Sequence, residues 1–276
     1  MTGLFSLTGK LAVLTGAAGF FGRPFTKALL EADATVLLLD RKSGQLNQLI
    51  EELVPGYGRA RAISYAADLY QPQERDQVFK RVLEEWGPPD ILINNAFDFT
   101  GRTGFNIEAG RPENTTYEQL EACFQSAFYW AFFATQALGP KMKERGRGSI
   151  INIGTMYADS VPNINKLYAG TNQFNPPGYS AGKGALLQFT KYSAAWLAPK
   201  VRVNMISPGA FPHPPEGTPN PATELVLSRL QQKILLERMG KPEDLIGTLI
   251  FLASDVSSYI TGENIGVDGG ITVTVT

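Results

Sequence analysis

The sequence predicts a single α/β domain over residues 1–276, built as a doubly wound parallel sheet. Two observations predict this fold. Short apolar runs such as Leu11-Ala12-Val13-Leu14, typical of strands buried on both faces, alternate along the chain with longer stretches of helical character. The first apolar run leads directly into a glycine-rich turn, and a helix is expected to follow it. Strands that alternate with helices in this way favour parallel pairing.

The expected elements follow one another without an internal domain boundary. Strands are expected near residues 11–15, 35–39, 62–66, 91–94, 149–153, 201–206 and 264–267. Helices are expected near residues 20–32, 45–53, 73–86, 117–145, 179–197, 223–233 and 242–253.

The first two strands indicate a dinucleotide site of the Rossmann type. The glycines of Thr15-Gly16-Ala17-Ala18-Gly19-Phe20-Phe21-Gly22 let the backbone approach a pyrophosphate, and the following helix directs its free N–H groups toward it. Asp40 ends the second strand, where a carboxylate can accept hydrogen bonds from the adenosine ribose and favours NAD. The neighbouring Arg41 could instead pair with a 2′-phosphate, so NADP stays possible.

Tyr179 and Lys183 are the candidate catalytic pair. Residues four apart share one face of a helix, so a Lys183 ammonium near the Tyr179 phenol is expected to lower a pKa that is about 10 when unperturbed. Tyrosine would then serve as an acid or base near neutral pH. Because this spacing also occurs on ordinary amphipathic helices, the argument depends on the glycine turn upstream.

With further motifs, the sequence resembles the short-chain dehydrogenase/reductase family over nearly all of its length. The motifs are Asp68 after the third strand, Asn94-Asn95-Ala96 after the fourth, Ser207-Pro208-Gly209 after the sixth, and Val267-Asp268-Gly269-Gly270 near the end. The resemblance implies catalysis by Thr155, Tyr179 and Lys183. It also implies cofactor contacts from Gly16, Ala18, Gly19, Phe20, Phe21, Gly22, Asp40, Arg41, Asp68, Leu69, Asn95, Ala96, Tyr179, Lys183, Pro208, Gly209 and Phe211.

The sequence departs from the family pattern at three places. Thr155 stands where the family has its catalytic serine, and its hydroxyl can still donate to a substrate oxygen. Ala127 stands where many members carry a relay asparagine, so a proton relay would run through Lys183 and water or use Gln125. The Thr-Gly-x-x-Gly-x-x-Gly spacing is the form of the longer, sugar-nucleotide-modifying branch.

Two segments, near 156–178 and 210–222, are expected to contact substrate. The first lengthens the path from Thr155 to Tyr179 and is rich in amide and aromatic side chains. Such a loop suits a polyhydroxylated ligand, whose hydroxyls it can hydrogen-bond, although it could serve only as a contact with another subunit. The segment is similar to those of oxidoreductases in bacterial surface-sugar and flagellin-glycan pathways.

These features predict an NAD(P)-dependent oxidoreductase that moves a hydride between nicotinamide and a secondary alcohol or its ketone, on a sugar or sugar derivative. One alternative is an epimerase or dehydratase acting on a nucleotide sugar. Another is a non-catalytic nicotinamide-dependent sensor.

Composition excludes several other classes. Lys and Arg total 25 against 26 acidic residues, so neither nucleic acid nor an anionic membrane is an expected partner. One cysteine and one histidine leave no internal disulfide and no expected metal site. Without an apparent signal segment, a cytoplasmic enzyme is expected. The aromatic run 122–137 is apolar on more than one face, which predicts a homodimer or homotetramer.

Overall fold

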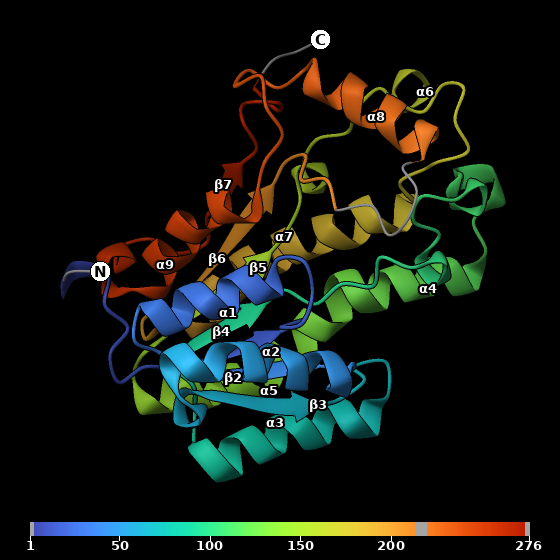
Figure 1. Cartoon of the computed structure of the whole chain (residues 1–276). Helices are drawn as coiled ribbons and strands as arrows, with labels where there is room; N and C mark the ends of the chain where they lie inside the picture. The colour runs from blue at the N-terminus through green and yellow to red at the C-terminus, as the bar shows by residue number, and fades with distance from the viewer. Residues whose placement is uncertain (1–2, 214–219, 274–276) are drawn as a thin grey trace.

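The computed structural model describes residues 3–213 and 220–273, and it contains the expected parallel sheet (Figure 1). The described strands lie in the order β3-β2-β1-β4-β5-β6-β7. Their bounds are β1 Leu11–Thr15, β2 Thr35–Asp40, β3 Ala62–Ala66, β4 Ile91–Asn94, β5 Gly148–Ile153, β6 Val201–Pro208 and β7 Asn264–Val267. The α-helices are α1 Gly22–Glu31, α2 Ser43–Tyr57, α3 Pro72–Trp86, α4 Tyr117–Phe124, α5 Trp130–Arg145, α6 Ile164–Leu167, α7 Pro177–Leu197, α8 Pro221–Gln231 and α9 Ile246–Ala253.

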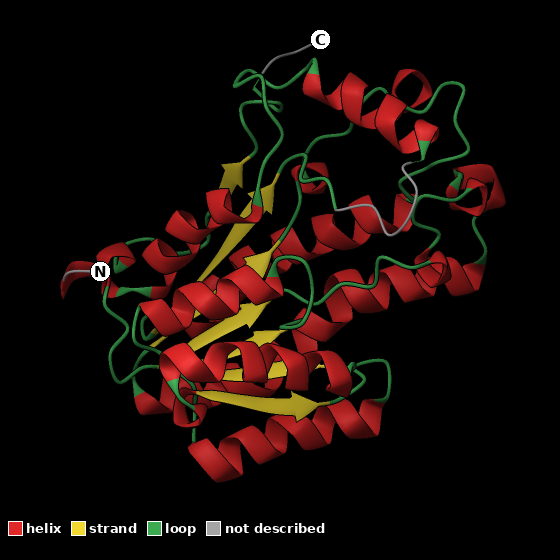
Figure 2. Ribbon diagram, in the orientation of Figure 1, coloured by secondary structure: helices red, strands yellow, loops and turns green. Residues whose placement is uncertain are grey.

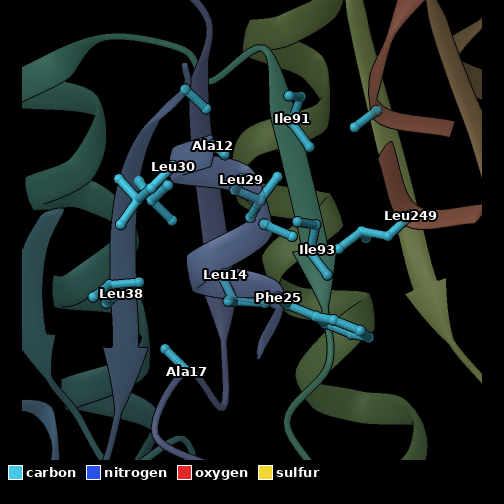
Figure 3. Packing of buried hydrophobic residues seen from close by; sticks show 14 of the residues in the cluster. Ala12, Leu14, Ala17, Phe25, Leu29, Leu30, Leu38, Ile91, Ile93 and Leu249 are labelled. Carbon is cyan, nitrogen blue, oxygen red and sulfur yellow. The ribbon is translucent and has the colours of Figure 1, made fainter. Parts of the chain in front are cut away.

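Alternate side chains of each central strand enter two separate cores, and helices cover both faces of the sheet (Figure 2). Ala12 and Leu14 of β1 pack with α1 and α9, where Phe25, Leu29 and Leu249 lie (Figure 3). Val13, between them, faces the opposite core, which α3, α5 and α7 cover. Burial on both faces explains why the strands read as continuous apolar runs.

The strand order reverses between β1 and β4, which are neighbours in the sheet although two strands separate them in the chain. In open α/β sheets, ligands bind outside the carboxyl ends of the strands at such a reversal. The segments that follow β1, β2, β3 and β4 therefore meet at the edge where the cofactor is expected.

The long helix expected over 117–145 is interrupted by a π-helical turn, Gln125–Tyr129, between α4 and α5. Its amino end is fixed by a capping box, in which the Thr116 hydroxyl accepts from the Gln119 N–H and the Gln119 amide oxygen accepts from the Thr116 N–H. The short helix α6 was not expected from the sequence.

The segment 156–178 forms an ordered cap together with α8. Met156, Leu167 and Phe174 pack against Val226 and Leu230 of α8. The Gln173 amide donates to the Thr223 hydroxyl at 2.5 Å, and Arg229 donates to the Leu167 and Ala169 carbonyls, each at 2.8 Å. Of the second expected substrate segment, 210–222, residues 214–219 lie outside the described part of the chain.

An aromatic cluster joins the π-helical turn and α5 to α7. The rings of Phe128 and Phe132 pack on Phe189 with centroid distances of 5.6 and 5.1 Å. All three rings retain contact with neighbours in the same chain, so the homodimer or homotetramer expected from this region stays a prediction. Within residues 3–213 and 220–273, no helix is long and apolar enough to cross a membrane.

Candidate active site

Thr155, Tyr179 and Lys183 come together at the carboxyl end of β5. Thr155 follows the strand, and the other two lie in the first turns of α7. Tyr179 is 7% exposed and Lys183 3% exposed. The Lys183 ammonium donates to the carbonyl of Ile153, the last residue of β5, at 2.7 Å. The strand end thus fixes the lysine, which lies four residues after Tyr179 on α7.

The expected lowering of the Tyr179 pKa by Lys183 is wrong for this structure. Burial raises the pKa of Tyr179 to about 12, although a hydrogen bond with Thr155 opposes the rise. Burial also lowers the pKa of Lys183 to about 7. Removal from water favours the neutral form of both groups, and this effect exceeds the attraction that the helical spacing suggested.

The low pKa of Lys183 predicts a pH-dependent stability for the protein without cofactor. The pKa is 10.5 in an unperturbed lysine and about 7 here, so between these values the unfolded chain binds the extra proton. The free energy of unfolding should therefore rise as pH increases from about 7 toward about 10, and it should be insensitive to this group at lower pH. In Lys183→Met, this contribution to the rise of the free energy of unfolding with pH should be absent.

Urea denaturation of wild type and Lys183→Met at about pH 7 and about pH 9.5 gives the free energy of unfolding of each protein. Between the two pH values, this free energy should rise more for wild type than for Lys183→Met. Equal pH slopes in the two proteins would show that Lys183 is not desolvated.

Three phenylalanines surround the Tyr179 ring and form what we call the aromatic wall: Phe97, Phe99 and Phe105. Their ring centroids lie 4.9, 6.2 and 4.9 Å from that of Tyr179. Phe99 is 48% exposed, so the wall reaches from the buried phenol to the surface. The sequence reasoning missed this wall, although Phe97 and Phe99, just after Asn94-Asn95-Ala96 at a strand's carboxyl end, were a usable signal.

His213 lies between the two halves of the site. Its ring is 4.3 Å from Phe20 of the glycine turn and 5.1 Å from Phe99 of the aromatic wall, measured between centroids. Residues 210–213 therefore reach both the expected cofactor side and the aromatic wall.

The glycine turn after β1 is held by side chains from β1 and the end of β4. The Asn95 amide donates to the carbonyls of Thr15 and Gly16, both at 3.0 Å, and the Thr15 hydroxyl accepts from the Asn95 and Ala96 N–H groups. Gly16 has a φ of 67°, and a Cβ there would lie 2.8 Å from the Ala96 Cα. The backbone approaches so closely that glycine is required.

The residues expected to bind the adenosine end lie along the neighbouring strand ends. Asp40 accepts from the N–H groups of Ala18 and Lys42, at 3.1 and 3.2 Å. Asp68 accepts from the Tyr70 N–H at 3.0 Å, and Leu69 between them is buried.

On the far side, Pro208 ends β6 and Gly209 donates to the Val267 carbonyl at 3.1 Å. Phe211 packs edge-on against Phe21 of the glycine turn, with a centroid distance of 5.4 Å. Gly19, Phe20 and Gly22 complete the turn itself.

This arrangement fits a nicotinamide dinucleotide. Asp40 keeps lone pairs for ribose hydroxyls, since each carboxylate oxygen accepts one backbone bond and has room for another. The Lys183 ammonium has three N–H donors, and one of them bonds the Ile153 carbonyl. The others remain available for the hydroxyls of the nicotinamide ribose. Arg41, in contrast, is paired with Asp98 at 3.2 Å.

Comparison with known proteins agrees with this site. A family model described as enoyl-(acyl carrier protein) reductase matches residues 16–272. The 3-oxoacyl-[acyl-carrier-protein] reductase FabG of Thermotoga maritima is 32% identical over 97% of this chain and 99% of its own length. The chain belongs to the short-chain dehydrogenase/reductase family. It is therefore an NAD(P)-dependent oxidoreductase, as the fold and the Tyr179/Lys183 pair indicate.

Two further members of the short-chain dehydrogenase/reductase family show the range of relatives. Galactitol 2-dehydrogenase (L-tagatose-forming) of Cereibacter sphaeroides is 31% identical over 98% of each chain. The structure of NADPH-dependent 3-quinuclidinone reductase from Rhodotorula rubra has a TM-score of 0.83 and 28% identity, and covers 98% of this chain and 94% of that one.

The relay position of the short-chain dehydrogenase/reductase family holds no polar side chain here. Ala127 lies in the π-helical turn against α7, where a Cβ added at Gly182 would lie 2.7 Å from the Ala127 Cβ. Gln125, the neighbour considered from the sequence, donates instead to the Glu121 carboxylate at 3.3 Å. The structure therefore gives Gln125 no contact with Lys183.

The amides of segment 156–178 are less available to substrate than their number suggested. Asn165 and Asn172 are exposed on the cap, and Gln173 is buried against Thr223. Asn175 is different, because its amide oxygen is buried without a hydrogen-bond partner among the described residues. Its backbone hydrogen-bonds Tyr168, and Tyr168 in turn hydrogen-bonds Tyr157. Burial raises the pKa of the Tyr157 hydroxyl, and the electrostatic influence of Tyr179 raises it further.

Proposed function

We propose that this protein moves a hydride between nicotinamide and a secondary alcohol or its ketone on a ring-shaped substrate, a sugar or sugar derivative. The aromatic wall is the observation that carries this proposal, because its three phenyl rings pack around the Tyr179 ring, whose hydroxyl would exchange a proton with the substrate oxygen. A sugar ring can bury the C–H groups of one face against such rings while its hydroxyls meet polar groups at the side.

Each catalytic residue has a distinct role in this proposal. The bound cofactor supplies the hydride chemistry. Tyr179 donates the hydroxyl proton when a ketone is reduced and accepts it when an alcohol is oxidised. Thr155 holds the substrate oxygen through its hydroxyl, and Lys183 holds the ribose with the donors that Ile153 leaves free.

Polar groups on the cap side support a hydroxylated substrate. Tyr157 lies within electrostatic range of Tyr179, and the amide oxygen of Asn175, which has no hydrogen-bond partner among the described residues, belongs to the same cluster. Two of the relatives are named for a sugar alcohol and for a ring ketone. A purely alicyclic alcohol is the second candidate, because the aromatic wall itself offers only apolar surface.

The experiment is a substrate panel followed at the nicotinamide absorbance band, with NAD and with NADP. It compares pyranoses and inositols with open-chain polyols and with cyclohexanols. We expect the highest kcat/KM for hydroxylated rings. Preference for open-chain polyols would contradict the proposal, and preference for cyclohexanols would favour the second candidate. Conversion without net cofactor change would indicate an epimerase or dehydratase, and binding without conversion would indicate a sensor.

Replacing Phe99 with leucine tests the aromatic wall. The best ring substrate of the panel should show a KM raised by about 3- to 10-fold, since an aromatic contact contributes about 0.5–1.5 kcal/mol beyond area. The KM for NAD should change little. Tyr259→Leu is the matched control, because it removes an exposed aromatic ring near the opposite, amino end of β7. Equal effects of both substitutions would remove Phe99 from the substrate site.

A further inference from the structure

Arg41 is paired with a buried carboxylate that lies far away in the sequence. Its guanidinium lies 3.2 Å from Oδ1 of Asp98, in the segment after β4. The Asp98 side chain is 1% exposed, whereas that of Arg41 is 36% exposed. The other oxygen, Oδ2, accepts from the Tyr70 hydroxyl at 2.9 Å. Asp98 therefore pairs with Arg41, just after β2, and with Tyr70, in the segment after β3.

The Tyr70 side of this network is fixed by packing. Tyr70 is buried, and its ring packs edge-on against Trp130 at the start of α5, with a centroid distance of 4.8 Å. The Arg102 guanidinium covers the ring at 3.6 Å from its centroid. The position of Asp98 is thus set by three parts of the chain, and Arg41 is the partner that reaches in from the surface.

Withdrawing Arg41 from Asp98 is costly. A buried carboxylate that loses its only ion-pair partner among the described residues keeps one neutral hydrogen bond, from Tyr70. A 2′-phosphate on the adenosine ribose would need a cation close to the end of β2, where Asp40 is held by two backbone N–H groups. That phosphate would therefore meet one carboxylate directly and compete with a second one for Arg41.

We propose that Asp98 is a positioning residue for cofactor choice: it holds Arg41 in an ion pair and so keeps the protein selective for NAD over NADP. Asp40 repels the 2′-phosphate, and Asp98 withholds the arginine that would otherwise bind it. The two carboxylates act on different groups, so their effects on NADP binding should add, and only the effect of Asp98 should depend on Arg41.

The test is a set of variants in which the dissociation constants of NADH and NADPH are measured by fluorescence titration. Asp40→Ser should raise the preference for NADPH by about tenfold, and adding Asp98→Asn should raise it by about tenfold again, because Arg41 is then free to reach the phosphate. Asparagine keeps an acceptor for the Tyr70 hydroxyl. Arg41→Gln in the double variant should cancel the second gain.

Several outcomes overturn the proposal. A second gain that persists without Arg41 would show that Asp98 acts by its own charge or by altering the loop. Wild type that binds NADPH more tightly than NADH would also overturn it. Arg41→Gln in the wild-type background provides a check that does not depend on how Asp98 variants fold. Glutamine retains a donor for Asp98, so the affinity for NADPH divided by the affinity for NADH should stay within about twofold of the wild-type value. A fall of about tenfold in this affinity ratio would mean that Arg41 already binds the 2′-phosphate.

Discussion

Tyr179→Phe is expected to lower kcat by about 10²–10⁴-fold, because it removes the group that exchanges a proton with the substrate oxygen. The phenyl ring still packs against Phe97 and Phe105, so the aromatic wall stays intact. NADH binding, measured by fluorescence titration, should remain near that of wild type. Steady-state kinetics with the best substrate of the panel gives the rate.

Tyr157→Phe is the matched control for this prediction. It removes a hydroxyl from a tyrosine of the same cluster, and burial raises the pKa of that hydroxyl too. We expect its effect mainly in KM, since Tyr157 lies on the cap side of the site. If Tyr157→Phe abolished turnover while Tyr179→Phe kept the wild-type rate, the acid and base would have been assigned to the wrong tyrosine.

The raised pKa of Tyr179 adds a directional expectation. With a pKa of about 12 the hydroxyl is protonated at neutral pH, which suits proton donation to a ketone. Oxidation of an alcohol needs the deprotonated form, so its rate should increase with pH more steeply than the rate of reduction.

Gly22→Ala is expected to have the largest effect on cofactor binding. A Cβ at this first residue of α1 would lie 2.0 Å from the Gly16 carbonyl oxygen and 2.6 Å from that of Ala17. Both obstacles are backbone atoms, so the turn and the helix would have to separate. Overpacking of this kind costs typically about 1–3 kcal/mol and sometimes more. The N–H groups aimed at the pyrophosphate would move apart.

The measurements are thermal denaturation and NADH titration, with a loss of at least about tenfold in affinity expected. Gly44→Ala, in α2, is the matched control. No atom lies within 4 Å of a Cβ at that position, so the change should not destabilise the helix. Unchanged NADH affinity in Gly22→Ala would place the pyrophosphate away from this turn.

Sequence reasoning predicted the fold well because its signals are local. The strands agree with expectation within two residues at either end, since an apolar run bounded by turns defines a buried strand directly. The bounds of α8 differed by two residues, because the Asn220 side chain caps the helix and Pro221 begins it. The break in the helix 117–145 was missed, since a π-helical turn leaves no clear trace in composition.

The site was predicted where spacing within one element decides it and missed where distant segments meet. Tyr179 and Lys183 share one helix, so their placement on its first turns followed from the sequence. The pairing of Arg41 with Asp98 joins residues from different strand ends, and no local pattern reports it. The Tyr179 pKa depends on burial by Phe97 and Phe105, which come from another segment. The amides of 156–178 were overvalued because composition does not show which of them the cap uses internally.

The segment after β4 has a consequence for how this protein can change during evolution. Within a few residues it carries Asn95, which holds the glycine turn, Asp98, which holds Arg41, and Phe97 and Phe99, which face Tyr179. A mutation that shifts this backbone to admit another substrate also moves the groups that choose the cofactor. Adaptation of the two specificities is therefore epistatic. Lineages that alter one are expected to acquire compensating changes in the other, and we expect deep mutational scanning to find the strongest pairwise coupling between residues 95–99 and Arg41.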